Sequence, residues 1–103
     1  MTEDTNIELR RRVLLCFQVA LLGMIGPNLR AVTVSWDNGG IKGILYFEGD
    51  LNEQAVEDAS DIEAEVMASF PGYEVSVIAQ RCDSPTKPRM TGAWAFMRRE
   101  TFR

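Results

Sequence analysis

The sequence predicts a single α+β domain over residues 1–103, with two helices on one face of an antiparallel four-stranded sheet. The first observation behind this is the order of the expected elements: helix, strand, strand, helix, strand, strand. The second is their periodicity, because apolar residues repeat every three or four positions in two segments and alternate with polar residues in four. The third is the length together with 46% hydrophobic residues, which allows one domain with its own core. Two hairpins and two amphipathic helices pack most simply as one antiparallel sheet covered on one side.

The first helix is predicted from about Asp4 to Ile25, where Gly26 and Pro27 end it. From Val13 onward this segment is apolar almost all round. A helix of this kind is covered on more than one side. One cover is the protein's own sheet, and the other is a second copy or a partner, so a homodimer is possible.

A β-hairpin follows the first helix. Residues 29–36 alternate between apolar and polar side chains, as a half-buried strand does. Residues 37–40, Asp-Asn-Gly-Gly, form a strong turn signal, and residues 41–47 supply the returning strand.

The second helix is predicted to begin at Asp50, with Glu53 three residues later in a capping-box arrangement; Asn52 is the alternative cap. Its inward stripe consists of Ala55, Ala59, Ile62, Val66 and Phe70, and Pro71-Gly72 ends it. A strand over residues 73–81, a loop to about residue 92 and a last strand over residues 93–99 are expected to form the second hairpin.

Charge is segregated along the sequence. Residues 43–80 carry nine carboxylates and no Lys or Arg. Four of the acids recur at successive i, i+4 positions of the second helix, where each like-charged pair costs about 0.2–0.5 kcal/mol. One interpretation is a solvated helix face, and the other is a surface that meets a basic partner. The absence of lysine from this segment favours the surface that meets a basic partner. The acidic candidates for partner binding are Glu48, Asp50, Glu53, Glu57, Asp58, Asp61 and Glu65.

Trp36 and Trp94 complete the predicted partner-binding set. Tryptophan is enriched at the hot spots of protein interfaces. The alternative is that each is a half-buried strand residue.

The residue types exclude several kinds of chemistry. Without histidine there is no Ser-His-Asp or Cys-His nucleophile and no His-ligated zinc. A net charge of −4 argues against nucleic-acid binding. The sequence therefore predicts no enzymatic activity and no cofactor. One alternative remains, an acid-site metal enzyme in which Asp58, Asp61 and Glu65 hold Mg²⁺ or Ca²⁺ from one helix face.

The cysteines and the apolar run indicate a cytoplasmic protein without a membrane anchor. Cys16 is predicted to be a buried free thiol and Cys82 to lie near the end of a strand, and both suit a reducing cytosol. The apolar stretch of residues 13–22 is too short to span a bilayer.

Several short segments together resemble small bacterial immunity proteins of contact-dependent growth inhibition and other polymorphic toxin systems. They are residues 27–32 (PNLRAV), Trp36-Asp37, Tyr46-Phe47 with Gly49, an acidic helix ending in Phe70-Pro71, and Gly92-Ala93-Trp94 with Arg98-Arg99-Glu100. The resemblance implies a cytosolic antitoxin that binds the C-terminal domain of a cognate toxin, often a basic nuclease, and blocks its active site. The competing interpretation is a homo-oligomeric structural or adaptor protein that associates through the apolar first helix.

Overall fold

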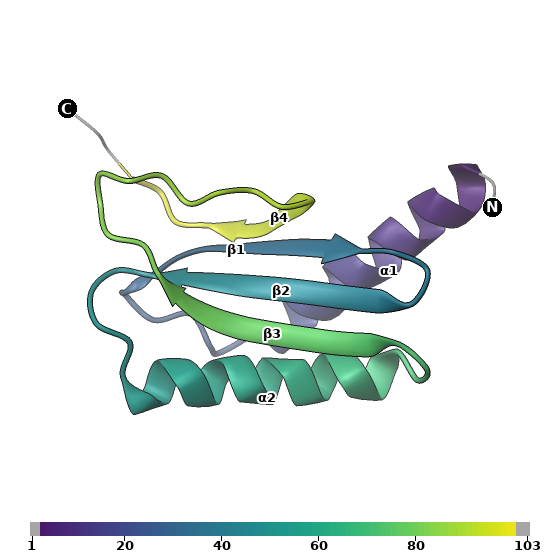
Figure 1. Cartoon of the computed structure of the whole chain (residues 1–103), viewed down its shortest axis with the longest axis horizontal. Helices are drawn as coiled ribbons and strands as arrows, with labels where there is room; N and C mark the ends of the chain where they lie inside the picture. The colour runs from purple at the N-terminus through teal and green to yellow at the C-terminus, as the bar shows by residue number, and fades with distance from the viewer. Residues whose placement is uncertain (1–2, 101–103) are drawn as a thin grey trace.

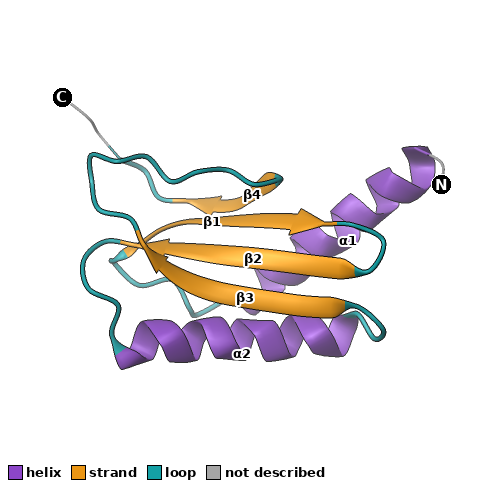
Figure 2. Cartoon of the chain, viewed as in Figure 1, coloured by secondary structure: helices purple, strands orange, loops and turns teal. Residues whose placement is uncertain are grey.

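The computed structural model describes residues 3–100, with side chains from residue 6 onward. The two helices and four strands follow one another in the predicted order (Figures 1 and 2). They are α1 (Glu3–Ala20), β1 (Leu29–Trp36), β2 (Gly40–Phe47), α2 (Glu53–Ser69), β3 (Glu74–Arg81) and β4 (Ala93–Met97).

The sheet is mixed, and the prediction of a purely antiparallel sheet was wrong. Its strand order is β3-β2-β1-β4, and β2 pairs with β3 in parallel while the other two pairs are antiparallel. The helix between β2 and β3 is the physical reason, because a strand–helix–strand connection returns the second strand in the same direction as the first. The predicted second hairpin does not form, since β4 pairs with β1 rather than with β3.

Both helices pack on one face of the sheet, as predicted. The core contains Val13 and Phe17 of α1 and Ile62 and Val66 of α2, each at most 1% exposed. The ring of Phe17 lies directly on Gly43 of β2, where an added Cβ would be 2.7 Å from the ring. Glycine at this position lets the helix approach the strand closely.

The loop of residues 82–92 covers part of the opposite face of the sheet, whereas Ile78 of β3 on that face is 40% exposed. Ala31, Ile44 and Tyr46 form a second small cluster there. The hydroxyl of Tyr46 donates a hydrogen bond to the carbonyl of Arg89 at 2.8 Å. The hydroxyl of Thr33 accepts one from the backbone N–H of Thr91 at 2.9 Å. These bonds hold the loop on the sheet while it crosses from β3 to β4 (Figure 1).

The boundaries of both helices differ from those predicted. Helix α1 ends at Ala20 rather than at Ile25, because Gly23 has a φ of 79° and takes the chain out of the helix. Helix α2 is capped by Asn52, whose side-chain oxygen accepts the N–H of Ala55 at 2.8 Å, so Asp50 is not the cap.

Two smaller expectations also change. Strand β4 ends at Met97 instead of residue 99. Cys16 is only partly buried, and both it and Cys82 are free thiols.

Candidate functional site

Four of the predicted acids form an exposed row along α2. Glu53, Glu57, Asp61 and Glu65 are all solvent-exposed, whereas the apolar stripe predicted for this helix is at most 5% exposed. The helical repeat separates the two sets, because residues four apart lie on the same side. Within residues 3–100, none of these four carboxylates forms an ion pair with a Lys or Arg. We call these four residues the acidic row.

Asp58 lies next to the acidic row and is half-buried. Its carboxylate accepts a hydrogen bond of 2.7 Å from the side-chain amide of Gln54, one helical turn earlier. This bond leaves the charge of Asp58 uncompensated, because the donor is neutral.

The other two predicted acids have partners inside the molecule. Glu48 accepts the backbone N–H of Ser84 at 2.7 Å and lies 4.0 Å from the guanidinium of Arg98. Asp50 forms an ion pair with Arg81. Both acids therefore help to hold the chain around the end of β2, apart from the acidic row.

The structure places the two tryptophans on opposite faces of the sheet. Trp36 is half-buried at the end of β1, against the core on the helix side, with the guanidinium of Arg10 5.8 Å from its ring. Trp94 packs against the small cluster beneath the loop of residues 82–92. The nine predicted site residues thus do not form a single surface.

The acid-site metal alternative lacks a geometric basis in the described chain. Among residues 3–100, no three Cys, Asp or Glu side chains gather closely enough to hold an ion. Asp58, Asp61 and Glu65 share one helix but do not converge on a point, which octahedral or higher coordination requires.

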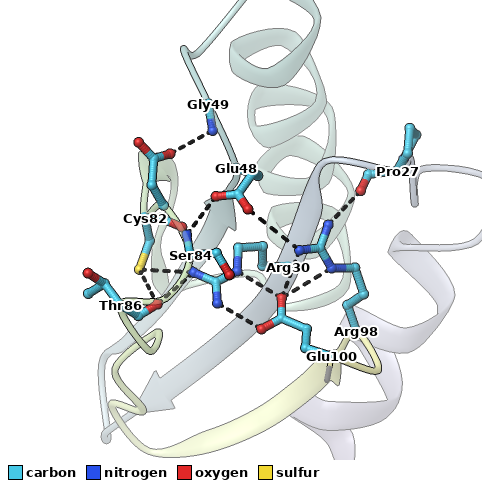
Figure 3. A network of polar contacts seen from close by, with 10 residues as sticks. Pro27, Arg30, Glu48, Gly49, Cys82, Ser84, Thr86, Arg98 and Glu100 are labelled. Atoms are coloured by element: carbon cyan, nitrogen blue, oxygen red, sulfur yellow. Dashed lines mark hydrogen bonds and ion pairs between the residues drawn. The ribbon is translucent and has the colours of Figure 1, made fainter. Parts of the chain in front are cut away.

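Sequence reasoning missed a buried charge network around Arg30, shown in Figure 3. A β-bulge between Leu29 and Ala31 places Arg30 out of register with β2. Its guanidinium donates to both carboxylate oxygens of Glu100, at 2.8 and 2.7 Å. It also donates to the carbonyls of Cys82 and Thr86, each at 2.7 Å. The side chain of Arg30 is completely buried, and these bonds compensate its charge.

Glu100 is held by a second arginine. Arg98 donates to the same carboxylate at 2.9 Å and to the carbonyl of Pro27 at 2.8 Å. The hydrogen bonds from Arg30, and then those from Arg98, lower the pKa of Glu100 from 4.5 to about 2. The network joins the start of β1 to the last described residues, so two of the segments that resemble immunity proteins meet here (Figure 3).

The fold and the site together define a small mixed α+β protein with an uncompensated acidic helix face. The sequence profile of the MafI2 immunity protein family matches residues 10–100. The chain therefore belongs to the MafI2 immunity protein family, which confirms the resemblance to immunity proteins of polymorphic toxin systems. No curated protein matches the chain.

The described helices also bear on the question of a membrane anchor. Neither α1 nor α2 is long and apolar enough to cross a bilayer.

Proposed function

We propose that this immunity protein binds the C-terminal domain of a cognate bacterial toxin, a basic nuclease, and inhibits it through the acidic face of α2. The observation that carries the proposal is the acidic row: four exposed carboxylates at i, i+4 spacing, without an intramolecular ion pair among the described residues. Membership of an immunity protein family supports a toxin as the partner.

The energetics of the acidic row favour an external partner. Each like-charged i, i+4 pair destabilises a helix by about 0.2–0.5 kcal/mol, and the helix dipole compensates only the acids of the first turn. A basic surface would neutralise the row on binding. It would also speed association, because complementary charge steers diffusional encounter.

The proposed mechanism needs no catalysis by the immunity protein. A nuclease domain binds phosphates through Lys and Arg, and a carboxylate row presents negative charge to the same residues. Bound there, the immunity protein would exclude the nucleic acid from the toxin's active site in the cytoplasm.

Co-production with a cognate toxin domain tests the proposal. We expect the protein to restore growth of cells that make the toxin domain and to form a stable complex with it in size-exclusion chromatography. The toxin domain of an unrelated polymorphic toxin is the control for specificity. Cells that remain poisoned, with no complex between the purified proteins, would contradict the proposed function.

A further inference from the structure

Helix α1 carries an apolar stripe that the fold leaves uncovered. Leu15 is 62% exposed, Val19 53% and Leu22 75%. Leu15 and Val19 are four residues apart in α1, and Leu22 follows three residues later in the turn after the helix. The opposite side of α1 is buried in the core through Val13 and Phe17. The helix was predicted to be covered on two sides, and the described chain covers only one.

A hollow of ≈ 280 Å³ lies between this stripe and α2. Leu15, Cys16 and Val19 line it from α1, and Glu65, Ser69 and Phe70 line it from α2 and its C-terminal end. The hollow is thus apolar on one side and bordered by a member of the acidic row on the other. Small-molecule pockets measure about 300–1,000 Å³, so a hollow of this size suits a protruding side chain better than a whole ligand.

The charges around the hollow decide what kind of partner fits. Arg12 borders it, but its guanidinium lies over the ring of Phe70 at 4.8 Å, as that of Arg10 lies over Trp36. The rings are neutral, so Arg10 and Arg12 keep their positive charges, and neither they nor Arg11 form an ion pair within residues 3–100. Negative charge at the hollow comes from Glu65, which continues into the acidic row, and a basic partner surface can pair with that row beside the apolar stripe.

We propose that the hollow between α1 and α2 receives an aliphatic or aromatic side chain of the toxin domain, flanked by Lys or Arg that pair with Glu65 and the rest of the acidic row. This inference rests on the proposed function and locates its interface. Interfaces of this type combine a desolvated apolar anchor with a charged rim. The apolar anchor slows dissociation, and the rim speeds association.

Paired substitutions test the location. In the variant Leu15→Gln/Val19→Gln, both side chains become polar while helix propensity is largely kept for the leucine position. The matched control is Val56→Gln/Met67→Gln, which changes two apolar residues of α2 that are 58% and 49% exposed and do not line the hollow. We expect the affinity for the purified toxin domain to fall at least about tenfold in the first variant, mainly through faster dissociation, and to change less than about twofold in the control.

Thiol alkylation of the unmodified protein gives an independent readout that does not depend on a variant folding correctly. Cys16 lines the hollow, and Cys82 lies on the other face of the sheet, and both are free and partly exposed. We expect the bound toxin domain to slow alkylation of Cys16, measured by mass spectrometry, and to leave that of Cys82 unchanged. Protection of Cys82 alone, or of neither thiol, would contradict the proposal.

The outcomes separate this inference from the function on which it rests. If the unmodified protein does not bind the toxin domain, the proposed function fails. If it binds and the Leu15→Gln/Val19→Gln variant binds equally well, only the location fails. If light scattering shows a dimer that this variant converts to a monomer without loss of toxin affinity, the stripe belongs to a second copy and the location is likewise refuted.

Discussion

Arg30 and Glu100 are 70 residues apart in the chain and form a bidentate ion pair, with hydrogen bonds of 2.8 and 2.7 Å. The side chain of Arg30 is 0% exposed and that of Glu100 is 15% exposed. Because the pair is nearly removed from water, loss of one member leaves the other charge uncompensated. The pair therefore fastens the segment after β4 to the start of β1.

The first prediction concerns the stability that this pair provides. Replacement Glu100→Ala should lower the free energy of unfolding by about 3–5 kcal/mol, because it leaves the buried guanidinium of Arg30 without its carboxylate. Urea denaturation measures the change. Arg99 is the neighbouring residue and is exposed, so Arg99→Ala should change the free energy of unfolding by no more than about 0.5 kcal/mol. Equal stability of the two variants would show that the pair adds nothing.

The second prediction is a pH dependence from the same carboxylate. The folded protein holds the pKa of Glu100 at about 2, against 4.5 ordinarily. A lowered pKa contributes stability that is present above the ordinary value and is lost as the pH falls toward the folded value. The difference in unfolding free energy between the unmodified protein and Glu100→Gln should thus shrink between about pH 4.5 and about pH 2. A difference that stays constant over this range would refute the assignment.

The third prediction tests the inward face of α2. Ile62 is 1% exposed, so Ile62→Ala should cost about 2–5 kcal/mol of stability through lost burial and a cavity. Val56 on the same helix is 58% exposed, and Val56→Ala should remain within about 0.5 kcal/mol. Thermal or urea unfolding of both variants checks the prediction. A cost below about half a kcal/mol at Ile62 would place it outside the core.

The fourth prediction concerns the close contact between α1 and β2. A methyl group at Gly43 would meet the ring of Phe17 at 2.7 Å, so Gly43→Ala should destabilise the protein by about 1–3 kcal/mol despite its better strand propensity. The added change Phe17→Leu should recover part of this loss by removing the ring. Gly26→Ala, where nothing lies within 4 Å of the new Cβ, is the control. Additive effects of the first two changes would show that the two positions are not coupled.

Periodicity predicted which side chains face the core but not which strands are neighbours. The spacing of Ile62 and Val66 identified the buried side of α2, and the Asp-Asn-Gly-Gly turn identified the hairpin of β1 and β2. Strand order depends on how connections cross the sheet. The connection through α2 makes β3 parallel to β2. The loop of residues 82–92 is hydrogen-bonded to Tyr46 and Thr33 of the sheet, and it leads to β4 beside β1 instead of beside β3.

Two contacts show why part of the polar architecture was not predictable. Glu63 is one of the nine acids of residues 43–80, a segment that contains no Lys or Arg. Its carboxylate nevertheless accepts a hydrogen bond of 3.0 Å from the backbone N–H of Val77, and so satisfies a donor of the edge strand β3. Arg30 is buried only because a bulge redirects it. Both contacts depend on tertiary geometry, whereas exposure of the acidic row follows from helical spacing alone.

The rate at which the protein associates with its toxin domain tests the central claim most directly. Changing Glu57 and Glu65 to Gln and Asp61 to Asn removes three charges with little change in shape and relieves repulsion along α2, so folding stability should not fall. Electrostatic steering can raise association rate constants from about 10⁵–10⁶ to 10⁸ M⁻¹s⁻¹ or more. Stopped-flow measurements at several salt concentrations should therefore show association slowed at least about tenfold at low salt, with a much weaker salt dependence. An unchanged rate constant and an unchanged salt dependence in this variant would show that the acidic row is only a solvated surface.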